Sequence, residues 1–230
     1  GMESTMSDLV REKLLEGMSV AEAVARDAVL HATLTAAADA TANALKSGRK
    51  LMVAGNGGSA ADAQHLAAEF VCRLSDDRPA MRAVALSTDS SILTAVSNDY
   101  GFERIFARQI EALGERGDVF FGISTSGNSP NVLRAIELCR TVGIITVGLT
   151  GKTGGKMPPL CDYCLRVPSD VTMYIQQAHL ALEHIFCLLV EQAYFSPEPA
   201  SGAVSQGRTT VARMRKIEGN ALRKLRERHT

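Results

Sequence analysis

Tryptophan is absent from this chain of 230 residues, and aromatic residues make up only 5% of it. Net charge is also missing, because 25 basic residues balance 25 acidic ones, and this composition excludes the fibrous and disordered classes of protein. No window reaches the roughly 18 uncharged apolar residues that a membrane span needs, and the first residues hold no apolar core typical of a secretory signal. We therefore expect a cytoplasmic protein that does not enter a membrane.

Hydrophobic residues make up 46% of the chain, which is enough to bury a sizeable core. The five cysteines are odd in number and lie mostly inside apolar runs, so we interpret them as reduced thiols of that core rather than as a disulfide framework. Cys161 and Cys164 form a CxxC pair. Because this pair enters a predicted strand, with no second pair and no helix after it, packing is the better interpretation.

Five short runs are apolar throughout and alternate with helical patterns. They are residues 51–55, 81–87, 118–124, 143–150 and 162–168. Strands that are covered by helices on both faces require such runs, so the sequence predicts an α/β fold with a doubly wound, mostly parallel five-stranded sheet. In such sheets ligands bind beyond the carboxyl ends of the strands. The residues that directly follow the runs are therefore the candidates for function.

Three parts are expected along the chain: an N-terminal segment (1–18), a domain that starts with a helical lead-in (19–195), and a linker with a tail (196–230). The alanine-rich stretch 19–45 has apolar residues at helical spacing, which predicts one long helix or two broken ones. The tail carries eight basic residues against three acidic ones, and its apolar residues recur at helical spacing. We therefore predict a basic amphipathic helix in the tail.

A glycine-rich loop follows the first apolar run, with Gly55, Gly57 and Gly58 ahead of a predicted helix. Glycines let a backbone approach a ligand closely, and Asn56 adds a polar group beside the unpaired N–H groups at the start of the helix. With Ala60 in third place the loop also fits the dinucleotide fingerprint, but no acidic residue ends the second run, so nicotinamide binding is disfavoured. A plain tight turn is the alternative.

A hydroxyl-rich loop follows the third apolar run. It contains Ser124, Thr125, Ser126 and Ser129. Hydroxyls and backbone N–H groups at the start of the next helix form a neutral cradle for a phosphate group, whereas the alternative is a plain N-cap. A nucleoside triphosphatase is disfavoured, because no P-loop glycine precedes the Gly151–Lys152 pair at the required spacing.

His65 and Glu69 lie four residues apart in the helix predicted after the glycine-rich loop, so both side chains project from one face. Such a pair is half of a metal site, a proton-transfer pair, or a pair on a helix surface. Five polar residues interrupt the late apolar helix over 171–194: Gln176, Gln177, His179, Glu183 and His184. Buried polar groups need partners, although one histidine on such a face is more often a satisfied core residue than a catalyst.

Five motifs in this order and at this spacing resemble the sugar isomerase (SIS) domain family, most closely its phosphoheptose isomerase branch. They are AGNGGSAADAQHLAAEF, TAVSNDYGFE, GISTSGNSPNV, LTGKTGG and YIQQAHLALEH, and the match spans roughly residues 21–195. The resemblance implies the SIS fold and homotetramers with active sites between subunits. It also implies conversion of sedoheptulose 7-phosphate to D-glycero-D-manno-heptose 7-phosphate through an enediol, which supplies heptose for the cell envelope.

The resemblance further implies roles for single residues. Glu69 would be the catalytic base and His184 the acid. One zinc ion per subunit would be held by His65, Glu69, Gln176 and His184. Substrate contacts are implied for Asn56, Gly57, Gly58, Glu69, Asn98, Asp99, Ser124, Thr125, Ser126, Ser129 and Gln176. Spacing alone would instead choose Gln177, which shares a face with His184 on an ideal helix.

Two rival functions on the same fold stay open: a non-enzymatic regulator that binds a replication-initiator-type partner, and another sugar-phosphate protein such as a sensor or etherase. Regulators of that kind lack the residues that match Glu69 and His184, and both are present here, which favours the enzyme. Ala60 and Met173 depart from residues found in some family members, which leaves the fine substrate contacts open. The tail has no counterpart in the usual enzyme, and bracing an oligomer is its favoured role, ahead of nucleic-acid contact or disorder.

Overall fold

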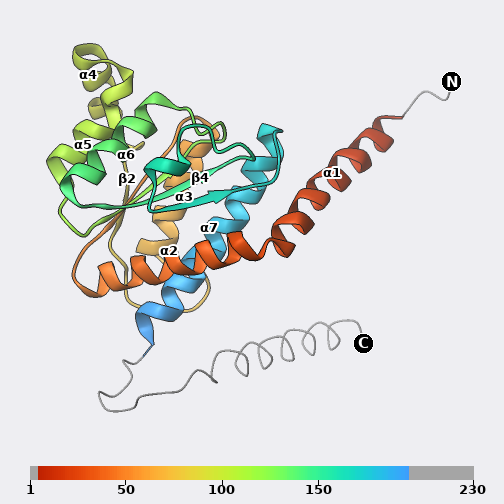
Figure 1. The fold of residues 1–230 in the computed structure, drawn as a ribbon, viewed down its shortest axis with the longest axis horizontal. Helices are drawn as coiled ribbons and strands as arrows, with labels where there is room; N and C mark the ends of the chain where they lie inside the picture. The colour runs from red at the N-terminus through yellow and green to blue at the C-terminus, as the bar shows by residue number, and fades with distance from the viewer. Residues whose placement is uncertain (1–4, 197–230) are drawn as a thin grey trace. The chain divides into compact units, whose positions relative to one another are not determined.

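A computed structural model describes residues 5–196, which form an α/β unit with helices on both faces of one sheet (Figure 1). The strands are β1 Leu51–Ala54, β2 Ala83–Ala85, β3 Val119–Ile123, β4 Ile145–Thr150 and β5 Tyr163–Arg166. All pairs of neighbours are parallel, in the order β2-β1-β3-β4-β5. The predicted doubly wound five-stranded sheet is therefore confirmed. The basic helix predicted in the tail lies outside the described residues.

The strand order reverses between β1 and β3, which are neighbours in the centre of the sheet. Both strands are buried along their whole length, which explains why their sequences are apolar throughout. In open parallel sheets the crevice at such a reversal is where ligands bind. The glycine-rich loop starts at this crevice after β1, and the hydroxyl-rich loop starts there after β3.

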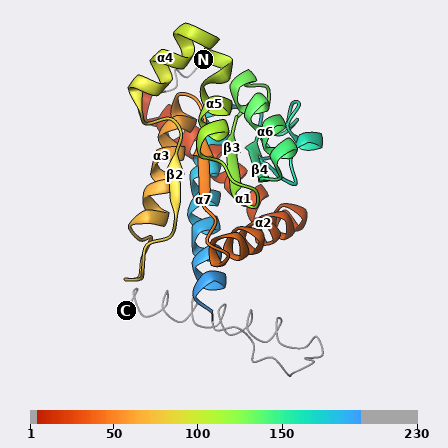
Figure 2. The same cartoon turned by 90° about the vertical axis from the view of Figure 1, so that its left-hand side faces the viewer.

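Two sets of helices cover the two faces of the sheet (Figures 1 and 2). The first set is α2 Ala28–Lys46, α3 Gly58–Val71 and α7 Thr172–Phe195. The second set is α4 Ser90–Tyr100, the short 3₁₀ helix η1 Phe102–Arg104, α5 Ile105–Leu113 and α6 Pro130–Val142. Each set packs its own apolar core on the sheet, with Phe121 and Phe186 in the first core and Phe106 and Phe120 in the second. The packing of α3 on α7 brings the first predicted site residues together.

The helical lead-in consists of two helices that break at Asp27. Helix α1, Met6–Arg26, ends there, and the Asp27 side chain accepts a hydrogen bond from the backbone N–H of Leu30 to cap α2. α1 begins inside the segment 1–18 that we set apart from the domain. Thr5 and Asp8 form a reciprocal capping box at its start, and this pattern explains the earlier beginning of the helix.

Helix α1 carries no buried residue, although one of its faces is apolar. Large apolar side chains that stay exposed on it are Leu9, Val10, Leu14, Leu15 and Met18. An exposed apolar face of this size marks an interaction surface rather than a solvated helix. Across residues 5–196, no helix combines the length and the hydropathy that a membrane crossing requires.

Candidate functional site

The glycine-rich loop carries the chain from β1 into α3. Gly57 has a φ of 55°, a left-handed conformation that glycine adopts without strain. A Cβ atom on Gly58 would lie 2.6 Å from Nε2 of Gln176, so this position needs a glycine for the side chain of α7 to reach the start of α3. The structure therefore brings Gln176 to the glycine-rich loop.

Gln177, in contrast, points to another helix. Its Oε1 would lie 2.7 Å from a Cβ atom on Gly17, which places it against α1. Ideal helical spacing pairs Gln177 with the face of His184, but in the structure Gln176 is the glutamine that faces α3. The preference for Gln176 as the site residue therefore has a geometric basis that spacing alone lacked.

Three potential metal ligands converge where α3 packs on α7. Nε2 of His65 lies 2.9 Å from Nε2 of His184 and 3.0 Å from Oε1 of Glu69. The two imidazole rings meet edge to face, with 5.1 Å between their centroids. His65 and Glu69 follow the i, i+4 spacing of α3, whereas His184 comes from the other side of the interface. The pair therefore faces a third polar side chain from another helix, while His65 itself stays exposed.

The donor set of this cluster fits a zinc ion. Two imidazole nitrogens and one carboxylate oxygen have ligand atoms that all lie within 4.8 Å of one another. Two donors at ~2.1 Å from a tetrahedrally bound zinc ion are separated by about 3.4 Å. The observed separations are a few tenths of an ångström shorter, so small side-chain rotations would admit the ion. Gln176, on the same helix as His184, lies against Gly58 at the start of α3.

The hydroxyl-rich loop turns tightly between β3 and α6. Ser124 is buried, and its Oγ lies 2.8 Å from Oγ of Ser129 and accepts a hydrogen bond from the N–H of Gly127. The Oγ of Ser126 accepts a hydrogen bond from the N–H of Asn128. Ser129 occupies the N-cap position of α6, but its side chain does not cap the helix. The plain N-cap interpretation therefore fails for Ser129, and its hydroxyl stays in the loop.

The segment after β4 packs on this loop. A Cβ atom on Gly127, whose φ is 68°, would collide with the carbonyl oxygen of Gly154. The N–H of Lys156 donates to the carbonyl oxygen of Gly127 at 3.0 Å and to Oδ1 of Asn128 at 3.2 Å. Glycine at position 127 is therefore required by the close approach of the two backbones as well as by its conformation.

One functional residue escaped the sequence analysis, namely Asn131. Its amide exchanges two hydrogen bonds of 2.8 Å with the amide of Asn56, which fixes the glycine-rich loop to the start of α6. Asn131 is only 1% exposed, and its Oδ1 also accepts the N–H of Val132. One indication of its role was available in the sequence: Asn131 is polar and stands in the first turn of a helix whose inner face must be buried. Asn56 uses its amide in this pair.

Asn98 and Asp99 lie near the end of α4, away from these loops. Both are exposed, and Asn98 donates a hydrogen bond to Asp99 at 2.8 Å. Among the described residues, none of the hydrogen bonds we find joins them to the glycine-rich loop, the hydroxyl-rich loop or His184. Figures 1 and 2 show α4 at the opposite end of the molecule from most of α7. The hydrogen bonds of Asn98 and Asp99 therefore do not connect them to the other predicted site residues.

The remaining polar residues of α7 are buried in the core. His179 is fully buried, its Nε2 lies 3.0 Å from the carbonyl oxygen of Thr150, and burial lowers its pKa to about 4. Glu183 is also fully buried, and burial, assisted by the charge of Asp62, raises its pKa to about 9. His179 is therefore a core histidine whose Nε2 is paired and whose buried Nδ1 has no hydrogen-bond partner among the described residues, whereas His184 faces α3.

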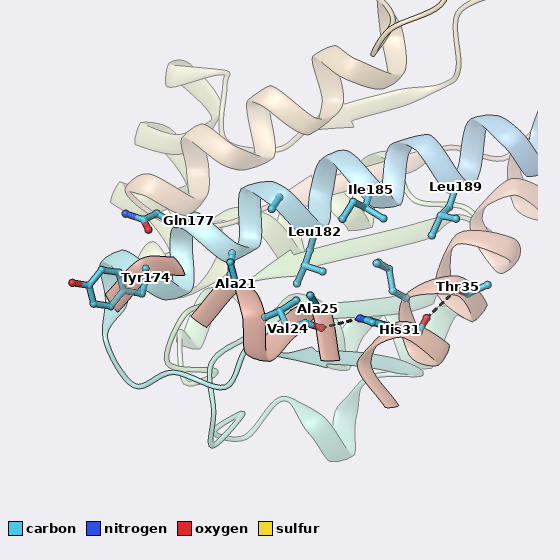
Figure 3. A pocket seen from close by; sticks show the side chains of 14 residues that line it. Ala21, Val24, Ala25, His31, Thr35, Tyr174, Gln177, Leu182, Ile185 and Leu189 are labelled. Carbon is cyan, nitrogen blue, oxygen red and sulfur yellow. Dashed lines mark hydrogen bonds between the residues drawn. The ribbon is translucent and has the colours of Figure 1, made fainter. Parts of the chain in front are cut away.

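A separate cavity of about 480 Å³ lies between α1, α2 and α7 (Figure 3). Alkyl side chains such as Val24, Leu182, Ile185 and Leu189 line it, together with His31, whose Nε2 lies 2.8 Å from the carbonyl oxygen of Val24. No acidic residue and no hydroxyl cluster lines this cavity. It therefore does not suit a sugar phosphate, and the candidate site is the crevice beyond β1 and β3.

Comparisons with known proteins identify the family of this chain. Residues 19–151 match the model of the SIS domain family. The phosphoheptose isomerase of Aneurinibacillus thermoaerophilus is 51% identical over 190 residues, which cover 83% of this chain and 96% of that protein. Phosphoheptose isomerase 2 of Campylobacter jejuni is 49% identical over 190 residues, covering 83% of this chain and 94% of that protein.

Solved structures give the same result. A phosphoheptose isomerase from Francisella tularensis superimposes with a TM-score of 0.78 at 34% identity, covering 82% of this chain and 99% of that one. The phosphoheptose isomerase of Neisseria gonorrhoeae superimposes with a TM-score of 0.76 at 38% identity, covering 82% of this chain and 100% of that one. The sequence comparison and the structure comparison therefore identify relatives of the same kind, the phosphoheptose isomerases.

Proposed function

The chain belongs to the SIS domain family as an isomerase of the phosphoheptose isomerase type, and we propose that it converts sedoheptulose 7-phosphate to D-glycero-D-manno-heptose 7-phosphate. The observation that carries this proposal is the convergence of Glu69 and His184 at the α3–α7 interface. The hydroxyl-rich loop follows β3, the neighbour of β1 in the sheet. The hydrogen bonds between Asn56 and Asn131 connect the glycine-rich loop after β1 to the start of α6, which follows the hydroxyl-rich loop. We propose that the enzyme works in the cytoplasm and supplies heptose for the cell envelope.

The phosphate group of the sugar is assigned to the hydroxyl-rich loop. Ser124, Thr125, Ser126 and Ser129 supply hydroxyls there without a cation, and the loop leads into the N-terminus of α6. Hydroxyls, backbone N–H groups and the positive end of a helix together favour a doubly charged anion. Because this binding energy comes from a remote part of the substrate, it can position the reacting carbons near α3.

Proton transfer is assigned to the α3–α7 side chains. The Glu69 carboxylate takes a proton from C1 of the ketose, and His184 donates a proton to the carbonyl oxygen at C2, which gives the enediol. Glu69 then returns its proton to C2, while His184 recovers a proton from the hydroxyl on C1 to leave the aldehyde. Each positioned acid or base contributes about 10²- to 10⁴-fold in rate.

Zinc is the metal that we propose for the same cluster, with His65, Glu69, Gln176 and His184 as its ligands. When bound, the ion supplies a Lewis acid that polarises the sugar carbonyl. The Glu69 carboxylate has two oxygens, so one can serve the ion while the other faces the sugar. The i, i+4 pairing of His65 and Glu69 in α3 orients these two side chains, and packing against Gly58 orients Gln176.

A homotetramer is the assembly that we propose, with each active site shared between subunits. Two observations support it. Nothing within residues 5–196 covers the apolar face of α1 or fills the cavity beside it, and a second copy of the chain would do so. Asn98 and Asp99 lie apart from the cluster of their own chain, so a neighbouring chain would have to bring them to it.

One assay tests the isomerase proposal. Purified protein is incubated with sedoheptulose 7-phosphate, with and without a chelator, and loss of the ketose is followed by mass spectrometry and chemical derivatisation. We expect conversion to the aldose phosphate without chelator and a slower reaction with it. Absence of conversion in both samples would contradict the proposal and favour the regulatory alternative, whereas conversion of a different ketose phosphate would change only the substrate.

A further inference from the structure

Cys161 and Cys164 meet over β4, where a glycine leaves room for them. A Cβ atom on Gly148 would lie 2.7 Å from Sγ of Cys161 and 3.5 Å from Sγ of Cys164. Each thiol is the main influence on the other, so the pKa of Cys161 is raised and the pKa of Cys164 is lowered. Both are free thiols, and both are only half-buried. The CxxC pair therefore packs against the second core and also brings two thiols together at one glycine.

The hollow beside Cys164 is lined by more basic than acidic side chains, and its Lys152 is paired with Asp170 at 3.7 Å. Cys164 lines a hollow of about 280 Å³ together with Lys152 and Arg166, and Asp27 is the acidic residue in the same lining. The carboxylate of Asp27 already accepts a hydrogen bond at the N-terminus of α2. Arg166 adds to the lowering of the Cys164 pKa by favouring its thiolate. Exposed thiols in electropositive surroundings are the ones that react as nucleophiles.

The cysteines of the core provide a contrast. Cys139 and Cys187 are buried, and burial raises the pKa of each to about 12. Thiols of this kind stay protonated and react slowly at neutral pH. Cys72 is exposed at the end of α3 and has no place in the pair, so it would compete with the pair for a reagent.

We propose that Cys161 and Cys164 form a redox-active dithiol that reacts with small anionic disulfides, with Cys164 as the attacking thiol and Cys161 as the resolving one. In the first step the Cys164 thiolate bonds to one sulfur of the reagent, whose S–S bond breaks and releases one small thiolate. In the second step Cys161 gives up its proton to solvent and attacks Sγ of Cys164, and the second small thiol leaves. Two protein thiols are oxidised, and one disulfide is reduced to two thiols.

The dithiol adjoins the segment that packs on the hydroxyl-rich loop. Cys161 follows the 3₁₀ helix η2, Pro158–Leu160, which continues from the Lys156 backbone that bonds to Gly127. Arg166 is also anchored to this segment, because its Nε donates to the carbonyl oxygen of Lys152 at 3.1 Å. The proposed disulfide would therefore form a few residues along the chain from the segment that packs on the hydroxyl-rich loop.

Oxidation of the full chain by oxidised glutathione tests the proposal. A Cys72→Ser parent removes the exposed competitor, and the native protein is treated at pH 7.5, quenched in acid and analysed by peptide mass mapping. We expect a peptide pair joined between Cys161 and Cys164, with the loss of two hydrogens. If glutathione leaves this pair reduced while the same protein in denaturant is oxidised, the proposal is overturned.

Single variants of the same parent separate the two roles. Cys161→Ser should accumulate a mixed disulfide on Cys164, and Cys164→Ser should modify Cys161 roughly tenfold more slowly. Equal or faster reaction of Cys161 would overturn the assigned order of attack. Peptide mapping of the parent, which keeps both cysteines, shows by itself whether the disulfide forms. The proposal can therefore be overturned even if one of the single variants fails to fold.

The cationic hollow has its own control. Arg166→Gln should slow the reaction with oxidised glutathione severalfold, whereas Lys46→Gln, at the exposed C-terminal end of α2, should not. The neutral reagent hydroxyethyl disulfide should react at similar rates with both variants. If Arg166→Gln slows both reagents equally or neither, the proposed preference for anionic disulfides is wrong.

Discussion

Nε2 of His65 lies 2.9 Å from Nε2 of His184, although 119 positions separate the two residues in the chain. Two imidazole nitrogens at this distance cannot both carry protons toward each other, so at least one of them presents a lone pair. Glu69 adds a carboxylate at 3.0 Å from the same atom of His65. A cation in this position would satisfy all three groups, whereas a second proton would not.

His65→Gln tests the metal assignment without removing the proposed acid or base. The variant loses one imidazole ligand, so the dissociation constant for zinc should rise at least about tenfold, as losses of metal-ligand contacts generally do. Isothermal titration with zinc on chelator-treated protein measures it. His31→Gln, at an exposed histidine that bonds to the Val24 carbonyl oxygen, is the matched control. Unchanged zinc affinity in His65→Gln would exclude His65 as a ligand.

Asn131→Ala should weaken both the fold and the crevice. The change leaves the amide of Asn56 and the N–H of Val132 without their partner in a buried position, which costs about 1–3 kcal/mol in the free energy of unfolding. The Michaelis constant for the sugar phosphate should also rise, because the two loops lose their link. Urea unfolding and steady-state kinetics measure the two effects, with Asn43→Ala on the exposed face of α2 as control. Stability equal to that of the control would contradict the role of the Asn56–Asn131 pair.

His179 gives a pH dependence of stability. Its pKa falls from 6.5 to about 4 on folding because burial disfavours the charged ring. Between these values the unfolded chain binds the proton and the folded chain does not, so the contribution of His179 to stability is present above pH 6.5 and is lost as the pH falls toward 4. Compared with His179→Gln, the wild type should lose up to ~1.4 kcal/mol per pH unit in this window. A difference between the two proteins that does not vary from pH 7 to pH 4.5 would contradict a neutral buried histidine.

The apolar face of α1 predicts what holds the subunits together. Leu14 and Met18 are 64% and 65% exposed in the single chain. Replacing both with glutamate should dissociate the oligomer, because burying charges in an apolar interface is unfavourable. Sedimentation equilibrium should show smaller species, and turnover should fall with them. Glu137→Lys on the exposed side of α6 is the control, and an intact oligomer in the Leu14, Met18 variant would place the interface elsewhere.

Much of the fold followed from local sequence patterns. Apolar runs predicted the five strands, because each strand is covered by helices, and the glycine-rich and hydroxyl-rich loops were predicted at the carboxyl ends of β1 and β3. The start of α1 was missed, since its only indication is the capping box of Thr5 and Asp8. Periodicity identifies an apolar face, but the capping residues determine where a helix begins.

The candidate site could be predicted only in pieces. Spacing placed His65 and Glu69 on one face of a helix, but the approach of His184 depends on how α3 packs on α7, which no local pattern encodes. Ideal helix geometry chose Gln177 on α7, whereas packing against Gly58 brings Gln176 to the loop. The family motifs indicated Gln176 and His184 as site residues, because such motifs combine residues from several helices and loops that meet only in the fold.

The most direct test of the account is turnover of sedoheptulose 7-phosphate by Glu69→Gln, measured as kcat for aldose formation in metal-loaded protein. We expect kcat of Glu69→Gln to fall by about 10²- to 10⁴-fold with an unchanged melting temperature, because the amide cannot accept the proton from C1. Glu137→Gln, on the exposed face of α6, should keep the activity of the wild type. If Glu69→Gln retains most of the turnover, Glu69 is not the base and the central claim is wrong.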